Sequence, residues 1–361
     1  MTPIVHAGFE ERIELGIITV PSGILVMTDM GYLGSWSGSA SPSRVPDQIT
    51  DPELRASIAA AQDYRLVGRD AEAAARVVDL QSLTYVYDIP RHGVPAIMAR
   101  YEEAIKEHGF DARLEREPSR VPHRERARRA AAAGGADFII DGVWSVAVGG
   151  IPTARPLPVV GHRRDYGEGV GPRWSEVKIE IEQDQISNNR ARLGLMGVDW
   201  ARIIAIDLEA LGSWVHERSL DGLADVAYWG RDASAAHAAF GGNELEDRTT
   251  GWSNLPEAEA LELAVRIEQW QRAPNHKLVV DYRPHSHHYQ VMQQIGPGGE
   301  FGVGWIEVGG ASVVAFHTSW GDGVYPVYRT GTSDRPSGLQ IELGDEARRQ
   351  RMHKLTRPGE P

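Results

Sequence analysis

The hydrophobic pattern begins with two short apolar runs on either side of a turn. Ile17, Ile18 and Val20 are apolar, as are residues 24–27, and Pro21-Ser22-Gly23 lies between the two runs. Glycine tolerates the positive φ that tight turns require, so the pattern predicts a β-hairpin here. Residues 37–52 are rich in Ser, Pro and Asp, which is typical of a loop.

The middle of the chain alternates between helical and extended patterns. Ile97, Tyr101 and Ile105 recur at four-residue spacing, and Gly109 supplies a stop signal. Residues 149–173, rich in Gly, Pro and Arg, are expected to form a long loop. The pattern predicts helices over 52–80 and 94–108, after Asp207 and after Asn254, and strands over 83–88, 110–115, 136–148, 177–181, 201–206 and 223–229.

From Lys277 onward, short extended runs separated by turn signals replace this alternation. That spacing is typical of a β-sandwich or barrel. The predicted strands cover 278–282, 287–295, 303–308, 311–317, 324–329 and 338–343.

These patterns predict an α+β protein. Residues 1–45 and 276–345 are expected to fold together as a β-rich, sandwich-like or barrel-like domain. Residues 46–275 would form an inserted α/β domain, and residues 346–361 a charged tail. We find no internal repeat in the sequence.

Composition narrows the function classes. The 361 residues include no cysteine, which excludes thiolate catalysis, Cys-ligated zinc and disulfides. The formal net charge of −12 disfavours nucleic acid and anionic membranes as general partners. The chain has no apolar run long enough to span a bilayer, and its N-terminus lacks the pattern of a secretory signal. We therefore expect a soluble, cytoplasmic protein.

The sharpest chemical feature is a group of histidines near Asp281. His285 and His287 would point the same way if they lay on one strand, and His317 or Asp281 could complete a metal site. Imidazole ligands would suit a divalent transition metal such as Zn²⁺, Fe²⁺ or Cu²⁺. The alternative is that these histidines are hydrogen-bonded packing residues.

Asp322 lies in a Gly-Asp-Gly sequence after an apolar strand. Asp-Gly is a strong hairpin signal, and a turn explains the motif by itself. In the functional interpretation, Asp322 would supply a carboxylate to a catalytic site with His287 and His317.

Seven arginines lie between residues 113 and 129. Interleaved acidic residues favour a solvated helix face, and a nucleic-acid or phosphate patch is the alternative.

Two terminal segments carry short motifs. The residues concerned are Ser22, Gly23, Leu25 and Asp29 in the first segment, and Gly321, Asp322, Gly323, Tyr325, Pro326 and Val327 in the second. They resemble the SG-x-L-x-V-x-DP run and the GDG-x-YPV run of a bacterial family of unknown function, the DUF4241 family, although Met30 stands where that family usually has proline. The resemblance implies that the two ends fold together, and it implies no reaction or catalytic residues.

Three functions remain open at this point. The first is a metal-dependent enzyme or small-molecule binder that uses the histidines, with arginines of residues 149–173 holding an anionic substrate. The second is an interaction or immunity-type protein whose acidic charge suits a basic partner protein. The third is nucleic-acid binding by residues 113–129.

Overall fold

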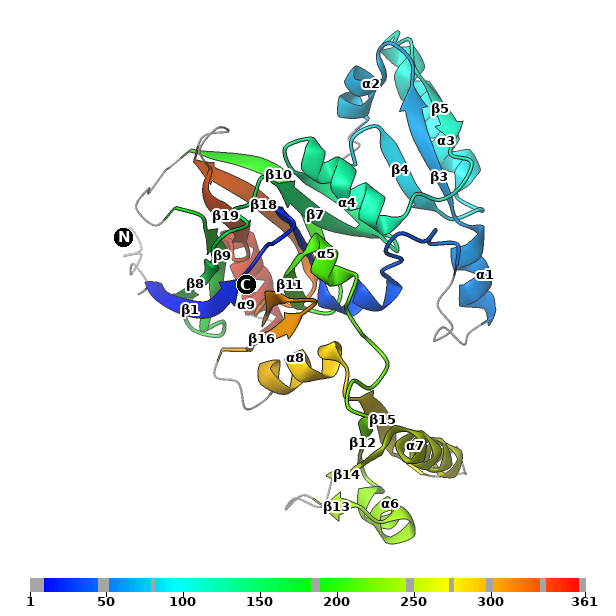
Figure 1. Ribbon diagram of the computed structural model, residues 1–361, viewed down its shortest axis with the longest axis vertical. Helices are drawn as coiled ribbons and strands as arrows, with labels where there is room; N and C mark the ends of the chain where they lie inside the picture. Colours follow the sequence, from blue (N-terminus) through cyan, green and yellow to red (C-terminus); the bar gives the residue numbers. More distant parts are fainter. Residues whose placement is uncertain are drawn as a thin grey trace. The chain divides into compact units, whose positions relative to one another are not determined.

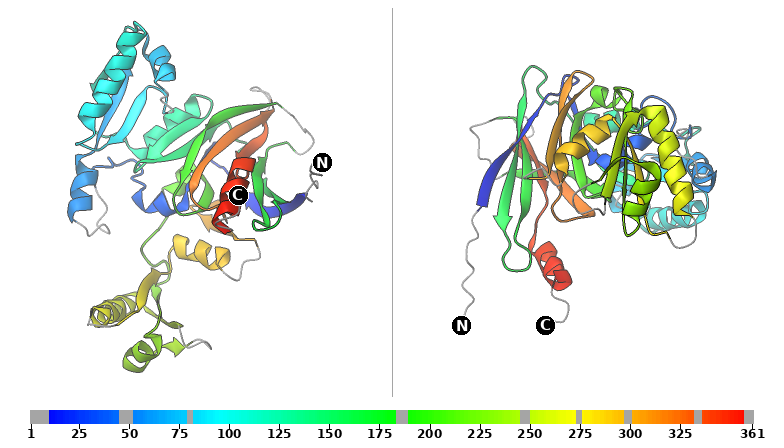
Figure 2. Two further views of the ribbon diagram at one scale, coloured as in Figure 1. Left: turned by 180° about the vertical axis from the view of Figure 1, so that it is seen from behind. Right: turned by 90° about the horizontal axis from the view of Figure 1, so that it is seen from below.

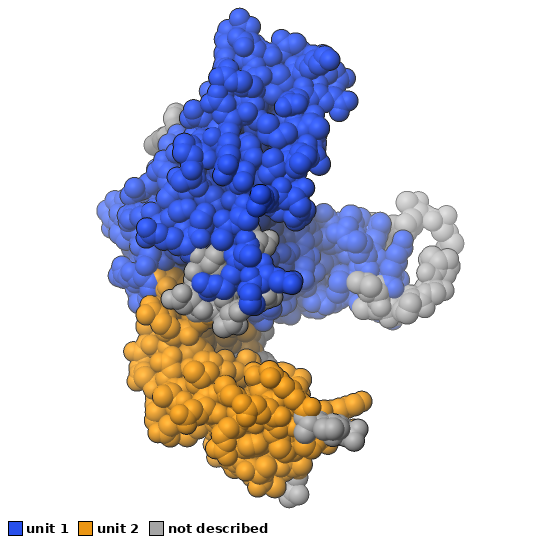
Figure 3. Space-filling model, turned by 90° about the vertical axis from the view of Figure 1, so that its right-hand side faces the viewer, with its two compact units in different colours: residues 1–213, 297–361 blue, residues 214–296 orange. Residues whose placement is uncertain are grey.

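The computed structural model describes residues 10–44, 52–78, 82–182, 189–244, 250–272, 276–296, 301–331 and 336–356. The protein is a mixed α and β structure with 29% helix and 40% strand in several sheets. The chain forms two compact units, coloured separately in Figure 3. Unit 1 contains residues 1–213 and 297–361, and unit 2 contains residues 214–296.

Unit 1 is built on two six-stranded sheets (Figure 1). The first sheet has the strand order β1 (Glu10–Ile18), β8 (Leu157–Asp165), β9 (Pro172–Glu180), β19 (Pro336–Glu342), β18 (Gly323–Gly331), β10 (Arg190–Val198). The second has the order β16 (Val303–Val308), β17 (Ala311–His317), β11 (Arg202–Asp207), β2 (Ile24–Asp29), β7 (Val143–Gly149), β6 (Ala136–Ile140).

Alternating apolar side chains from both sheets meet in one buried cluster. Leu25 and Phe316 contribute from the second sheet, and Val159 and Leu339 contribute from the first. Alternation places successive side chains on opposite faces of a strand, so each sheet can bury one face in this way. The shared cluster is the main hydrophobic core of unit 1.

The two strand orders are palindromic. Each sheet contains three strands from before residue 182 and three from after residue 189, and the two sets run inward from opposite edges of the sheet in the same order along the chain. The strands β1, β2, β6, β7, β8 and β9 thus correspond in order to β10, β11, β16, β17, β18 and β19. We call these two sets the first and second halves.

A buried aspartate marks the same place in each half. Asp29 ends β2 and caps the 3-10 helix η1 (Met30–Ser35), while Asp207 ends β11 and caps α5 (Leu208–Leu211). Each aspartate also accepts hydrogen bonds from the turn before the other strand: Asp29 from the backbone N–H of Asp199 and Trp200, and Asp207 from Ser22. The sequence D-x-x-x-L-G-S-W begins at both aspartates, so the repeat is visible in the sequence as well.

Each half carries a small α/β fold between its second and third strands. In the first half it has a three-stranded sheet in the order β4-β3-β5. Its elements are α1 (Pro52–Ala60), β3 (Gln62–Val67), α2 (Ala71–Val77), β4 (Tyr85–Ile89), α3 (Val94–Glu107), β5 (Arg113–Arg116) and α4 (His123–Ala132). Helix α4 packs across the β6–β7 hairpin (Figure 2).

The α/β fold of the second half is unit 2. Its sheet has the order β13-β14-β12-β15, with α6 and α7 packed on one face through Val226, Tyr228 and Ile267. Its elements are β12 (Leu223–Trp229), α6 (Ala233–Phe240), β13 (Asn243–Glu244), β14 (Thr250–Pro256), α7 (Glu257–Gln271), β15 (Val279–Pro284) and α8 (His287–Ile295). A final helix, α9 (Glu346–Thr356), follows β19 in unit 1.

The two α/β folds also correspond in detail. The sequence G-R-D-A-x-A-A begins at Gly68 after β3 and at Gly230 after β12. In both, the aspartate of the motif pairs with the preceding arginine and accepts a backbone N–H, from Asp111 in one fold and Lys277 in the other. Our expectation of no internal repeat is therefore wrong.

Several sequence predictions are corrected by this fold. Residues 17–27 contain two strands, but β1 pairs with β8 while β2 pairs with β7 and β11, so they do not form a hairpin. The predicted helix over 52–80 is interrupted by β3, and the predicted loop over 149–173 contains the paired strands β8 and β9. The predicted strand over 287–295 is helix α8, because Ser286 caps a helix there by accepting the N–H of Tyr289.

The boundaries of the two compact units also differ from those of the predicted domains. The terminal segments do share sheets, as expected, because β1 lies in one sheet with β18 and β19. Strands from the predicted insertion over 46–275 lie between them, however, and only residues 214–296 form a separate unit. The pattern of apolar runs gives the strands but not their partners, which is why these boundaries differ.

Candidate functional site

The predicted histidine site is divided between the two units. His285 and His287 belong to unit 2, whereas His317 and Asp322 belong to unit 1. Across the described ranges, no three His, Asp or Glu side chains come together in a way that could hold a metal ion. The metal site predicted from His285, His287, His317 and Asp281 is thus not supported.

His285 follows β15 and lies between two carboxylates. Its Nδ1 is 2.9 Å from an oxygen of Asp221, and its Nε2 is 3.4 Å from an oxygen of Asp225. Burial lowers the pKa of His285, but hydrogen bonds to the two aspartates outweigh it and raise that pKa overall. Tyr289 stacks on the imidazole and donates its hydroxyl to Asp225. Because both ring nitrogens face carboxylates, His285 is held as one part of an ion-pair cluster.

His287 is the first residue of α8 and has a different set of contacts. Its Nδ1 accepts the backbone N–H of Val215 at 2.9 Å, and its ring packs against Trp214. Burial lowers its pKa. Asp281 lies in the middle of β15 and accepts a hydrogen bond from Arg283. The structure therefore directs His285, His287 and Asp281 to separate partners.

His317 is the last residue of β17, and Asp322 lies in the turn before β18. Nδ1 of His317 accepts the backbone N–H of Ser319. Burial lowers the pKa of His317, with Arg202 and Arg173 acting in the same direction and Asp322 opposing them. Asp322 is thus close enough to influence His317, but it is exposed.

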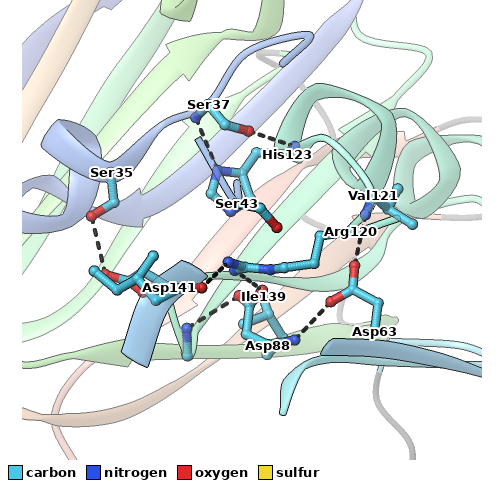
Figure 4. Close-up of polar contacts among 12 residues, drawn as sticks. Ser35, Ser37, Ser43, Asp63, Asp88, Arg120, Val121, His123, Ile139 and Asp141 are labelled. Carbon is cyan, nitrogen blue, oxygen red and sulfur yellow. Dashed lines mark hydrogen bonds and ion pairs between the residues drawn. The ribbon is translucent and has the colours of Figure 1, made fainter. Parts of the chain in front are cut away.

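The α/β fold of unit 1 contains a buried charge cluster that the sequence analysis missed (Figure 4). Arg126 is fully buried between Asp63 and Asp88. Its five N–H donors are all used: Nε by Val121, and the two terminal nitrogens by the carbonyl of Ile139 and the two carboxylates. A guanidinium with no free donor cannot bind a ligand, so Arg126 has a structural role.

Asp88 is the centre of this cluster. Burial by itself would raise its pKa, but the Arg126 and Arg120 guanidiniums outweigh burial, and the pKa of Asp88 is held well below its usual range. Its φ of +58° is unusual for a residue other than glycine, and its carboxylate pairs with both arginines.

His123 corresponds to His287 of unit 2. Its Nδ1 accepts the backbone N–H of Ser37, and its ring stacks on Trp36 at 5.7 Å, the same distance as between His287 and Trp214. Burial, with help from Arg126, lowers the pKa of His123 to about 3, so the ring is neutral. Its Nε2 has no hydrogen bond in the described structure, although the Ser35 backbone lies close enough to affect that pKa.

A cavity of about 20 Å³ lies beside His123, Arg120 and Asp141. Roughly 10–15 Å³ of such space holds one water molecule. The cavity therefore has room for a water and not for a substrate.

Arg120 also lines a larger pocket, of about 420 Å³. This volume falls within the range of small-molecule sites. We call it the arginine pocket; it is lined by Ser43, residues 59–63, Arg91 and residues 116–120.

Three arginines from different segments reach the arginine pocket. Arg91 follows β4, Arg116 ends β5 and Arg120 precedes α4. Arg120 is buried and uses its terminal nitrogens on Ile58 and Asp88, while its Nε lacks a partner in the described structure. Arg91 and Arg116 are exposed, and neither forms an ion pair with any described residue. The pocket thus offers unpaired guanidinium groups.

The carboxylates that line the arginine pocket are already engaged. Asp63 pairs with Arg126, and Glu117 lies 3.8 Å from the guanidinium of Arg65. Their charges therefore do not compensate Arg91 and Arg116. Sequence analysis noted the arginines of residues 113–129 but could not separate buried, paired and free members. Other arginines of this segment pair with acidic residues: Arg113 with Glu115, Arg124 and Arg128 with Glu209, and Arg129 with Glu125.

No family model, curated protein or solved structure matches the chain. The resemblance of the two terminal segments to the DUF4241 family therefore stays a prediction. None of the helices in the described ranges combines the length and apolar character that a membrane span requires.

Proposed function

We propose that the protein binds a small anionic molecule in the arginine pocket. The observation that carries this proposal is the pair of exposed, unpaired guanidiniums of Arg91 and Arg116 on a pocket of about 420 Å³ that buried Arg120 also lines. Guanidinium groups bind carboxylates and phosphates through paired, charge-assisted hydrogen bonds. This keeps the small-molecule hypothesis of the sequence analysis but changes the site.

The setting of the pocket supports this proposal. Arg120 is fixed by Asp88 and by the carbonyl of Ile58, so one guanidinium is held in place before a ligand arrives. We further propose that the two sheets of unit 1 form a sandwich-like scaffold for the pocket, which the core cluster shared by both sheets supports. The metal-dependent reaction expected at His285, His287 and His317 stays a prediction.

Calorimetric titration tests this function with citrate and a nucleoside monophosphate as carboxylate and phosphate probes. We expect at least one probe to bind the full-length protein. Arg91→Ala and Arg116→Ala should each weaken that binding by roughly tenfold or more, because hydrogen bonds to charged groups contribute about 1.5–3 kcal/mol.

Arg76→Ala is the matched control. Arg76 is an exposed arginine of α2 that pairs with Glu72 and does not line the pocket. Its removal should leave affinity unchanged. Absence of binding for both probes, or equal affinity in all three variants, would refute the proposed function.

A further inference from the structure

The two α/β folds differ in what covers the second face of their sheets. In unit 2, α6 and α7 cover one face, and the opposite face presents Trp229 of β12, Trp252 of β14 and Val279 of β15. These side chains are 37%, 37% and 47% exposed. We call this the open sheet face; Asp225, Asp281 and Arg283 lie on it as well.

In the first half, the chain itself covers the corresponding face. Asp63 and Asp225 are equivalent positions of the two folds. Tyr85 lies opposite the second residue after Asp63, and Trp252 lies opposite the second residue after Asp225, so Tyr85 corresponds to Trp252. Arg129 of α4 lies over the Tyr85 ring, and Tyr87 is buried.

The apolar side chains that complete this cover in the first half are Ile139 of β6 and Trp144 of β7. These two residues face each other across the β6–β7 hairpin. Strand register against β2 and β11 assigns the corresponding pair of the second half to Glu307 and Ser312, which face each other across β16–β17. Glu307 and Ser312 are polar and hydrogen-bond to each other. The second half thus has polar residues at the positions that correspond to Ile139 and Trp144.

We infer that the open sheet face of unit 2 is a docking surface for a basic segment of a partner protein. Among aromatic side chains, tryptophan rings attract Lys and Arg cations most strongly. Asp281, which pairs with Arg283 but is 46% exposed, and the largely buried Asp225 lie on the same face. Asp221 lies beside His285 at its end and is exposed. Unit 2 contains 12 acidic against 7 basic residues, and the whole chain carries −12. Such a surface attracts a cationic partner and repels nucleic acid.

One contact on this face is of the kind that we expect an arginine of the partner to make. The Arg283 guanidinium lies 5.9 Å from the centre of the Trp229 ring and pairs with Asp281. A partner arginine bound against a tryptophan ring of this face would make a contact of the same kind. This inference rests on residues outside the arginine pocket, so it stands or falls independently of the proposed function.

Fluorescence anisotropy with a labelled oligo-arginine peptide tests the inference on the full-length protein. We expect binding that weakens with salt, and a loss of roughly tenfold in affinity in the Trp229→Ala/Trp252→Ala double variant. Conservative Trp229→Phe/Trp252→Phe should retain part of the affinity, because phenylalanine keeps a weaker ring face. Leu261→Ala is the control, since Leu261 is 50% exposed on α7, which covers the other face of the sheet.

Three results would overturn the inference. Equal peptide affinity in wild type and the double alanine variant would mean that net charge alone binds the peptide. Tighter binding of polyuridylate than of oligo-arginine would assign the face to nucleic acid. Sedimentation showing self-association that the double variant abolishes would make the face a contact between copies of this chain. Unchanged circular dichroism of the variants confirms that they remain folded.

Discussion

At the scale of single residues, Asp207 joins three segments of unit 1. One carboxylate oxygen caps α5 through the N–H groups of Glu209 and Ala210, and the other accepts the backbone N–H and hydroxyl of Ser22. Asp29 performs the corresponding role in the first half. A buried carboxylate is stable only when it is hydrogen-bonded in this way.

Asp207→Ala should therefore destabilise the protein by about 2–4 kcal/mol, because it removes a helix cap and the two charge-assisted hydrogen bonds from Ser22. Urea unfolding followed by circular dichroism measures the change. Asp322→Ala, at an exposed turn position, should shift the free energy of unfolding by less than about 0.5 kcal/mol. Similar values for the two variants would contradict the joining role of Asp207.

His123 makes stability depend on pH. Its pKa is lowered to about 3 in the folded protein, against about 6.5 when unfolded. Between these values the unfolded chain binds the additional proton, so the free energy of unfolding rises with pH from about 3 to about 6.5 and is flat above. One such group contributes a slope of up to about 1.4 kcal/mol per pH unit.

His123→Gln keeps an acceptor for the N–H of Ser37 but has no titrating group. We expect a shallower pH dependence of stability in this variant between about pH 4 and 6. A residual slope will remain, because burial also lowers the pKa of His216 to about 4. An unchanged slope, measured by urea unfolding at several pH values, would show that His123 is not a source of acid sensitivity.

At the scale of elements, the apolar pattern predicted helices and strands correctly where the apolar period is clear. Helix α3 and strands β11, β12, β16 and β17 lie close to their predicted positions, because each has a clear apolar period. The largest error was α8, where histidines and glutamines resemble an extended run. The segment forms a helix because Ser286 caps its N-terminus and because Val291 and Ile295 are buried on one side of it.

The metal site predicted at His285 and His287 depended on this wrongly predicted strand. The argument that His285 and His287 share a face required a strand, and a helix beginning at His287 removes that geometry. Arg120 and Arg126 could not be distinguished from their exposed neighbours, because burial depends on what β3, β4 and the β6–β7 hairpin place around them. The repeated G-R-D-A and D-x-x-x-L-G-S-W motifs were the sequence signals that could have pointed to the two corresponding folds.

At the scale of the whole molecule, the two α/β folds differ in how they are held. Unit 2 has its own core cluster. The fold of the first half has a smaller one around Leu66, Ala74 and Ile105, but it shares Arg126 and a second cluster of Tyr87, Val121 and Ile139 with the adjoining β6–β7 hairpin. A separate core can support independent folding.

We therefore expect residues 214–296, expressed alone, to unfold cooperatively on heating. Residues 52–132 serve as the matched control and should not fold alone, since Arg126 would lose its bond to the carbonyl of Ile139 and Tyr87 its apolar cover. Thermal melts followed by circular dichroism compare the two fragments. A cooperative melt of the control, or its absence for residues 214–296, would contradict this difference.

By itself, the sequence determined which residues are apolar, where most strands run, and the acidic charge of the chain. These properties depend on side-chain chemistry and on neighbours close along the chain. Only the tertiary structure decided that β1 and β2 join different sheets, that equivalent strands of the two halves lie in the same two sheets, and that Arg91, Arg116 and Arg120 line one pocket. Those features depend on which strands pair across long stretches of chain, and apolar periodicity is the same for every partner that a strand could take.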